Sequence, residues 1–187
     1  MADQLYLSYW LRGYSPPAMP HYFERVLAAF PFSRLTQAPS LMRVYAVEFA
    51  EPALYERMFP SVPEPPALAE VVRQFLNPDC CYELEAAWDL WQGKEDWSLV
   101  PARVVIQCRG PEFLSDAGEH IRIFCGIDSL FLPDPAVAAS VRFAESNVRS
   151  LLKLSHDLDA ALPAEKRLLW TESGENFAAL LERRLFH

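Results

Sequence analysis

The sequence predicts an α+β fold with a mixed, mostly antiparallel sheet, one long helix and three short helices. Residues 82–91, 102–109 and 120–125 alternate apolar and polar side chains, which is typical of half-buried strands. Helical spacing of apolar residues marks the segments between other strands, and this mixture is typical of α+β folds. The order is compatible with a ferredoxin-like arrangement or a tandem of two such halves.

The N-terminal part contains two predicted strands and two short predicted helices. Residues 5–12 alternate as a strand, and residues 23–30 place apolar side chains on one helical face before Pro31 ends the helix. Residues 41–49 form the second predicted strand. Residues 51–66 hold too many prolines for a central strand, so we expect a long surface loop or arm there. A helix follows over residues 68–76 and ends before Pro78.

The three alternating segments predict an antiparallel meander with one apolar and one polar face. Matching side chains of opposite charge sets the expected pairing of the strands. In the first hairpin the expected pairs are Glu83 with Arg109, Glu85 with Gln107, Ala87 with Val105 and Asp89 with Arg103. In the second hairpin they are Arg109 with His120 and Gln107 with Arg122.

The C-terminal part predicts a long helix, a strand and a last helix. Apolar residues from Val137 to Leu162 recur at spacings of four and three, as in a heptad pattern. We expect one helix that lies across the sheet, and a self-associating coiled coil is the alternative. Residues 167–171 are the last predicted strand, and residues 175–185 the last helix, with Ser173 as its N-cap.

The length of 187 residues suffices for a sizeable core without a metal or a disulfide. We therefore expect a single domain over residues 1–187, with two structural halves, 1–100 and 101–187, as the alternative. No sequence motif is shared between the two halves at a fixed period.

The composition is acidic and excludes several classes of function. The formal net charge of -8 disfavours nucleic-acid binding, because phosphate contacts depend on Lys and Arg. No run of apolar residues is long enough for a membrane span, and the first residues lack the pattern of a signal peptide. We expect a soluble, cytoplasmic protein that does not bind membranes.

The sequence predicts neither a metal site nor a bound cofactor. The cysteines Cys80, Cys81, Cys108 and Cys125 match no zinc-ligand spacing, so buried free thiols are expected. The six glycines form none of the loops that commonly cradle nucleotide phosphates.

The polar face of the meander holds the only group of residues that suggests chemistry. The expected pairing puts Glu83, Arg109 and His120 in one row, with Arg122 nearby. His120 could act as a general base oriented by Glu83, while Arg109 or Arg122 holds an anionic group. The alternative is a solvated charge ladder, which is the usual composition of an exposed sheet face.

Two functions remain open at this point. The acidic charge, the proline-rich arm and the heptad-spaced helix favour an interaction or ligand-binding protein that docks on a protein partner or forms a homodimer. The other hypothesis is a small hydrolase or isomerase with its site on the polar face of the meander. Whether the chain is an enzyme, and which substrate or partner it takes, does not follow from the sequence.

Overall fold

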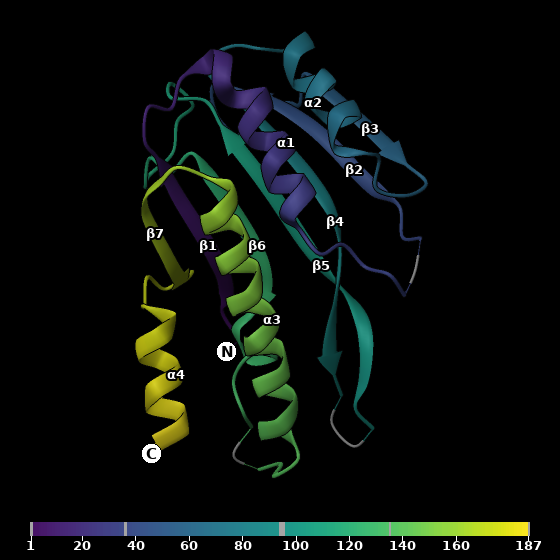
Figure 1. The fold of residues 1–187 in the computed structure, drawn as a ribbon, viewed down its shortest axis with the longest axis vertical. Coiled ribbons are helices and arrows are strands. Elements are labelled where there is room, and N and C mark those ends of the chain that lie inside the picture. The colour runs from purple at the N-terminus through teal and green to yellow at the C-terminus, as the bar shows by residue number, and fades with distance from the viewer. Residues whose placement is uncertain (1, 36, 94–95, 135, 187) are drawn as a thin grey trace.

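The computed structural model describes residues 2–35, 37–93, 96–134 and 136–186. It is an α+β structure with a sheet in the order β3-β2-β4-β5-β6-β1-β7, in which all neighbouring strands are antiparallel (Figure 1). The strands are β1 (Gln4–Leu11), β2 (Ser40–Ala46), β3 (Tyr55–Phe59), β4 (Cys80–Gln92), β5 (Ser98–Arg109), β6 (Ile121–Ile127) and β7 (Ala164–Thr171). The helices are α1 (Met19–Ala29), α2 (Pro65–Gln74), α3 (Ser140–Ala161) and α4 (Phe177–Phe186), with the short 3-10 helices η1 (Pro16–Ala18) and η2 (Asp128–Leu130).

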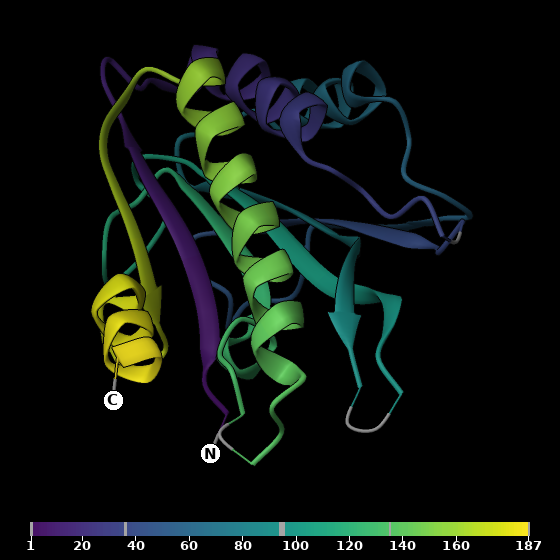
Figure 2. The same cartoon turned by 60° about the horizontal axis from the view of Figure 1, so that its bottom comes forward.

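The molecule has two layers. Helices α1, α2 and α3 cover one face of the sheet, and α4 follows β7 at the end of that strand (Figure 2). No helix among the described residues covers the opposite face, which we call the open face. Side chains from all seven strands lie on it: Tyr6, Arg43, Glu56, Glu83, Glu85, Arg103, Gln107, Arg109, Arg122, Phe124 and Trp170.

The alternation in the sequence decides which side chains face the helices. Leu84 and Leu90 on β4 and Ile106 on β5 are fully buried in the core, as the pattern predicts. They pack with apolar residues of the covering helices, such as Phe23 on α1 and Leu158 on α3. Burial of such a side chain stabilises the fold by about 1.5 to 3 kcal/mol.

The predicted register of the first hairpin is wrong by two residues. Glu83 pairs with Gln107 rather than Arg109, and Glu85 pairs with Val105. Ala87 lies opposite Arg103, and Asp89 lies opposite Pro101. A shift of two residues keeps every side chain on its face, so the alternation could not reveal it. The predicted register of the second hairpin is confirmed, because Gln107 pairs with Arg122.

The proline-rich segment contains a strand that the sequence did not predict. Residues Tyr55–Phe59 form β3 at the edge of the sheet, between Pro52 and Pro60. Proline is tolerated beside an edge strand because no further strand needs its missing N–H. The expectation of a long surface loop or arm is therefore wrong for Tyr55–Phe59, which form an edge strand rather than a central one.

Two predicted boundaries also differ from the structure. Strand β2 ends at Ala46 because the next residue, Val47, has a φ of 69° and turns the chain. The N-cap of α4 is Asn176, whose Oδ1 accepts hydrogen bonds from the N–H groups of Ala178 and Ala179. The backbone N–H of Ser173 instead donates to the carboxylate of Asp3. The prediction of Ser173 as the N-cap of the last helix is therefore wrong.

The heptad-spaced residues of helix α3 pack against other parts of the same chain. Ala144, Leu151 and Leu158 are buried against the rest of the fold. The side chain of Asn147 is also buried and bonds to the backbone of Trp91 and Leu130 at distances of 2.7 to 2.9 Å. The face that could have formed a coiled coil is thus largely occupied by the sheet.

The two halves proposed from the sequence share the sheet. Strand β1 lies between β6 and β7, both of which come from the second half. All four cysteines are buried and free. In the part of the chain that the structure describes, no helix is both long enough and apolar enough to span a bilayer.

Candidate functional site

A continuous network of polar side chains crosses the open face from β3 to β6. It contains four arginines and four glutamates, whose formal charges cancel, joined through Gln107. The charged members are Arg43, Glu56, Glu83, Glu85, Arg103, Arg109, Glu119 and Arg122. Each of them has at least one partner of opposite charge within the network.

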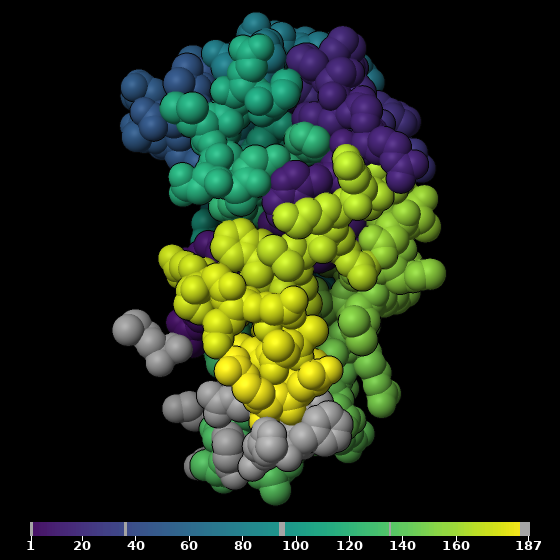
Figure 3. All heavy atoms as spheres, turned by 90° about the vertical axis from the view of Figure 1, so that its left-hand side faces the viewer, coloured from purple at the N-terminus to yellow at the C-terminus, as the bar shows by residue number. Residues whose placement is uncertain are grey.

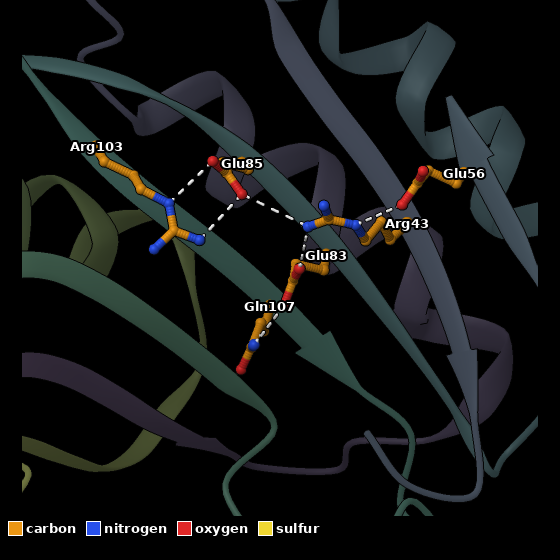
Figure 4. A network of polar contacts seen from close by, with 6 residues as sticks. All are labelled: Arg43, Glu56, Glu83, Glu85, Arg103 and Gln107. Carbon is orange, nitrogen blue, oxygen red and sulfur yellow. Dashed lines mark hydrogen bonds and ion pairs between the residues drawn. The ribbon is translucent and has the colours of Figure 1, made fainter. Parts of the chain in front are cut away.

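The β3 side of the network is a charge ladder of arginine and glutamate (Figure 4). The guanidinium group of Arg43 lies 2.8 Å from Glu56, 3.3 Å from Glu83 and 3.5 Å from Glu85. Glu85 also accepts two hydrogen bonds from Arg103, at 2.9 and 3.0 Å. Both carboxylates of β4 therefore already have cationic partners.

These contacts shift the pKa values of the ladder. Hydrogen bonding to Arg103 lowers the pKa of Glu85, and the nearby Arg43 lowers it further. Burial favours a lower pKa for Arg43, but the hydrogen bonds to Glu56 and Glu83 outweigh it and raise the pKa. Both shifts stabilise the charged forms of Glu85 and Arg43.

The centre of the network is a buried ion pair. Arg109 Nη1 lies 2.7 Å from Glu119 Oε1, and the two side chains are only 4% and 0% exposed. Arg109 also donates to Ser115 and to Gln107. Gln107 in turn donates to Glu83 at 2.7 Å, which connects the buried pair to the charge ladder.

The β7 side of the network is an arginine–aromatic cluster formed by Tyr6, Arg122, Phe124 and Trp170. The guanidinium carbon of Arg122 lies 5.4 Å from the ring centre of Tyr6 and 5.2 Å from that of Trp170. The rings of Tyr6 and Trp170 are 5.0 Å apart, and Phe124 adjoins Tyr6 at 6.0 Å. Arg122 also contacts the buried carboxylate of Glu119, so its position is fixed from two sides.

The structure does not bring His120 into the predicted row. Its Nδ1 accepts a hydrogen bond from the backbone N–H of Leu11 at 2.8 Å, and its ring stacks on Tyr14 at 4.0 Å. Burial lowers the pKa of His120, although Glu119 opposes the effect. The ring is therefore neutral at pH 7, with its proton on Nε2, and the nitrogen that could accept a proton is already occupied.

The other three predicted site residues do lie in one network. Glu83 reaches Arg109 through Gln107 rather than directly. Arg109 and Arg122 do hold an anion, but the anion is the carboxylate of Glu119. Sequence reasoning missed Glu119 because it lies in the loop before β6, outside the alternating pattern. The available signal was a single acidic residue directly before the predicted strand 120–125, whose expected neighbour on the adjacent strand is Arg109.

Two cavities among the described residues lie away from this network. One of about 680 Å³ lies between α1 and the start of α2 and is lined by residues such as Leu27, Phe30 and Pro65. Another of about 580 Å³ is lined by residues such as Trp91 and Asp128. Neither is lined by Glu83, Arg109 or His120.

Among the described residues, no three His, Cys, Asp or Glu side chains are grouped so as to hold a metal ion. Comparison of the chain with protein-family models, with curated proteins and with solved structures gives no match. The fold and the network thus define an α+β domain in which one sheet face carries a charge-balanced network and is covered by no helix among the described residues.

Proposed function

We propose that this protein is a non-catalytic binding domain that docks on another protein through its open face. The proposal rests on the network itself. Its charged side chains hold one another in place, and it ends at Arg122, which lies between Tyr6 and Trp170. Such side chains have little freedom left to lose when a partner covers them.

Preorganisation of this kind favours protein binding. Ordering a long, free side chain at an interface costs about 0.5 to 1.5 kcal/mol, and a side chain that is already fixed avoids much of that cost. Trp, Tyr and Arg are also the residue types that dominate the binding energy of interfaces. The cluster of Tyr6, Arg122 and Trp170 combines all three types on neighbouring strands.

The size of the open face also fits a protein partner. With strands about 4.8 Å apart and about 3.3 Å per residue, seven strands of about eight residues cover roughly 900 Å². One side of a standard interface buries about 800 Å². The whole face is therefore of the same order as one side of an interface, although the loop that carries Glu119 covers the part around Arg109.

The balance of charges argues for a protein rather than a polyanion. The network has as many glutamates as arginines, so it presents no net positive field to phosphate groups. A partner with alternating charges would match the charge ladder, and an apolar or aromatic residue would pack on Trp170.

Two variants with the same chemical change test the proposal. Arg103→Glu alters the open face, and Arg149→Glu alters the exposed surface of α3; the two side chains are 59% and 81% exposed. Tagged wild type and both variants are used as bait in extract of the cells that produce the protein, and bound proteins are quantified by mass spectrometry. Circular dichroism verifies that each bait is folded.

We expect a partner that wild type and Arg149→Glu retain equally and that Arg103→Glu retains about tenfold less, as for the loss of one good interface contact. The purified partner should show the same order of affinities by calorimetry. Capture of a second copy of this chain with that pattern would identify the open face as a homodimer interface. Partners unaffected by Arg103→Glu, or none at all, would exclude docking on this face.

A further inference from the structure

A second surface lies where the loop after β2 meets the loop after β5. We propose that this surface, formed by Val47, Phe49 and Leu114, binds a basic segment of another protein that carries an apolar anchor. We call it the loop patch. It is separate from the charge ladder, and the proposal goes beyond docking on the open face.

The loop patch exposes three apolar side chains on two adjoining loops. Val47, Phe49 and Leu114 are 44%, 40% and 61% exposed. The backbone N–H of Leu114 donates to the carbonyl of Val47 at 2.8 Å, which holds the two loops together. Segments 47–54 and 110–119 lie next to each other in the upper part of the space-filling view, in blue and teal (Figure 3).

The patch rests on a rigid base. Phe49 packs edge-on against Phe113, with ring centres 4.9 Å apart, and against Tyr45 at 5.1 Å. The guanidinium group of Arg109 lies 5.3 Å from the ring centre of Phe49. Phe113 is itself buried. The exposed ring of Phe49 is therefore held in place by the residues beneath it.

Val47 has a backbone conformation that is costly for its residue type. Its φ of 69° is the only positive value at a non-glycine position among the described residues. A β-branched side chain is disfavoured there, and such strain is common at binding sites. The N–H of Val47 donates to Asp79 at 2.8 Å, so both backbone groups keep the residue in this conformation with its side chain exposed.

The charges around the patch decide the chemistry of the partner. Residues 46–54 and 110–119 contain no Lys or Arg. They contain Glu51, Glu112 and Asp116, which are exposed, and Glu48, which is half-buried. An apolar centre with an acidic rim is complementary to apolar side chains flanked by lysine or arginine, and it repels acidic partners.

A defined peptide serves as the probe. It is a fluorescein-labelled lysine peptide that carries one leucine and one phenylalanine, and its binding is followed by fluorescence anisotropy. Two control peptides replace the apolar residues by serine or the lysines by glutamate. We expect saturable binding of the first peptide only, with an affinity that falls as salt is added.

Matched variants locate the binding on the protein. Leu114→Ser and Leu152→Ser make the same change at side chains that are 61% and 60% exposed, the first on the loop patch and the second on α3. We expect Leu114→Ser to weaken peptide binding about tenfold and Leu152→Ser to leave it unchanged. Glu112→Lys should weaken it as well, whereas Glu145→Lys on α3 should not.

The variant Val47→Gly removes both the backbone strain and the exposed side chain at this position. Glycine adopts a positive φ without the steric cost, so we expect a higher urea midpoint together with weaker peptide binding. Failure of the lysine peptide to saturate on wild type, or equal effects of Leu114→Ser and Leu152→Ser, would overturn the proposal. A variant Val47→Gly that binds the peptide as tightly as wild type would also count against it. None of these outcomes depends on the Arg103→Glu experiment.

Discussion

Arg109 and Glu119 form an ion pair at 2.7 Å in which neither side chain is more than 4% exposed. Removing both ions from water is costly, and their mutual attraction offsets this cost only with the help of further hydrogen bonds. Among the described residues, Arg109 Nε has no such partner, but the other guanidinium nitrogens do. Ser115 and Gln107 accept hydrogen bonds from Arg109, and Arg122 also contacts the carboxylate. The stability of the open face therefore depends on one carboxylate that two arginines share.

Substituting Glu119 should destabilise the fold strongly. In Glu119→Gln, Arg109 stays buried without an anionic partner, and we expect the free energy of unfolding to fall by about 3 kcal/mol. Urea unfolding at pH 7 measures this change. Glu112→Gln, at an exposed position of the same loop, should change the free energy of unfolding by no more than about 0.5 kcal/mol. Similar losses in both variants would contradict a special role of the buried pair.

His120 should make stability depend on pH. Burial lowers its pKa below the ordinary value of 6.5, so the unfolded chain binds this proton more readily than the folded one. The free energy of unfolding should therefore decrease as the pH falls from about 7.5 to about 5. His120→Asn keeps an acceptor for the N–H of Leu11 but cannot titrate, so its decrease should be smaller. If the free energy of unfolding depends on pH in the same way in wild type and in His120→Asn, then His120 contributes nothing to that dependence.

Asn147 should be essential for joining α3 to the end of β4. Its side chain accepts from the N–H of Trp91 and donates to the carbonyls of Trp91 and Leu130. Asn147→Ala leaves these groups unpaired, and we expect a loss of about 2 to 4 kcal/mol of unfolding free energy. Hydrogen exchange at Trp91 should become faster, whereas Arg149→Ala on the same helix should leave it unchanged. An unchanged exchange rate in Asn147→Ala would contradict this role.

The contact between Glu85 and Arg103 should be visible as a pKa shift but contribute little to stability. Loss of the hydrogen bond in Arg103→Gln should raise the pKa of Glu85 toward its ordinary value of 4.5, as measured by NMR titration. Because the folded pKa is depressed, this contribution to stability is present above 4.5 and is lost as the pH falls through the folded pKa. Arg103 is largely exposed, so a double-mutant cycle should give no more than about 1 kcal/mol. A coupling several times larger would mean that the ladder acts as a cooperative unit.

Residue patterns predicted the extended segments but not all of their partners. Alternation located β4, β5 and β6, and the core positions Leu84 and Ile106 followed from it. Strand β3 was missed because its pairing with β2 outweighs the prolines that flank it. Of the predicted site residues, Glu83, Arg109 and Arg122 lie in one network, and His120 lies outside it.

The sequence by itself determined which side of each strand faces the core, because the alternation of apolar and polar residues has a period of two and needs no knowledge of the neighbouring strand. Only the tertiary structure decided the register of the first hairpin and the place of β1 between β6 and β7. It also decided that Glu119 reaches Arg109 from a loop. A shift by two residues leaves the alternation intact, and contacts between distant segments leave no local pattern, so both depend on the packing of the whole chain.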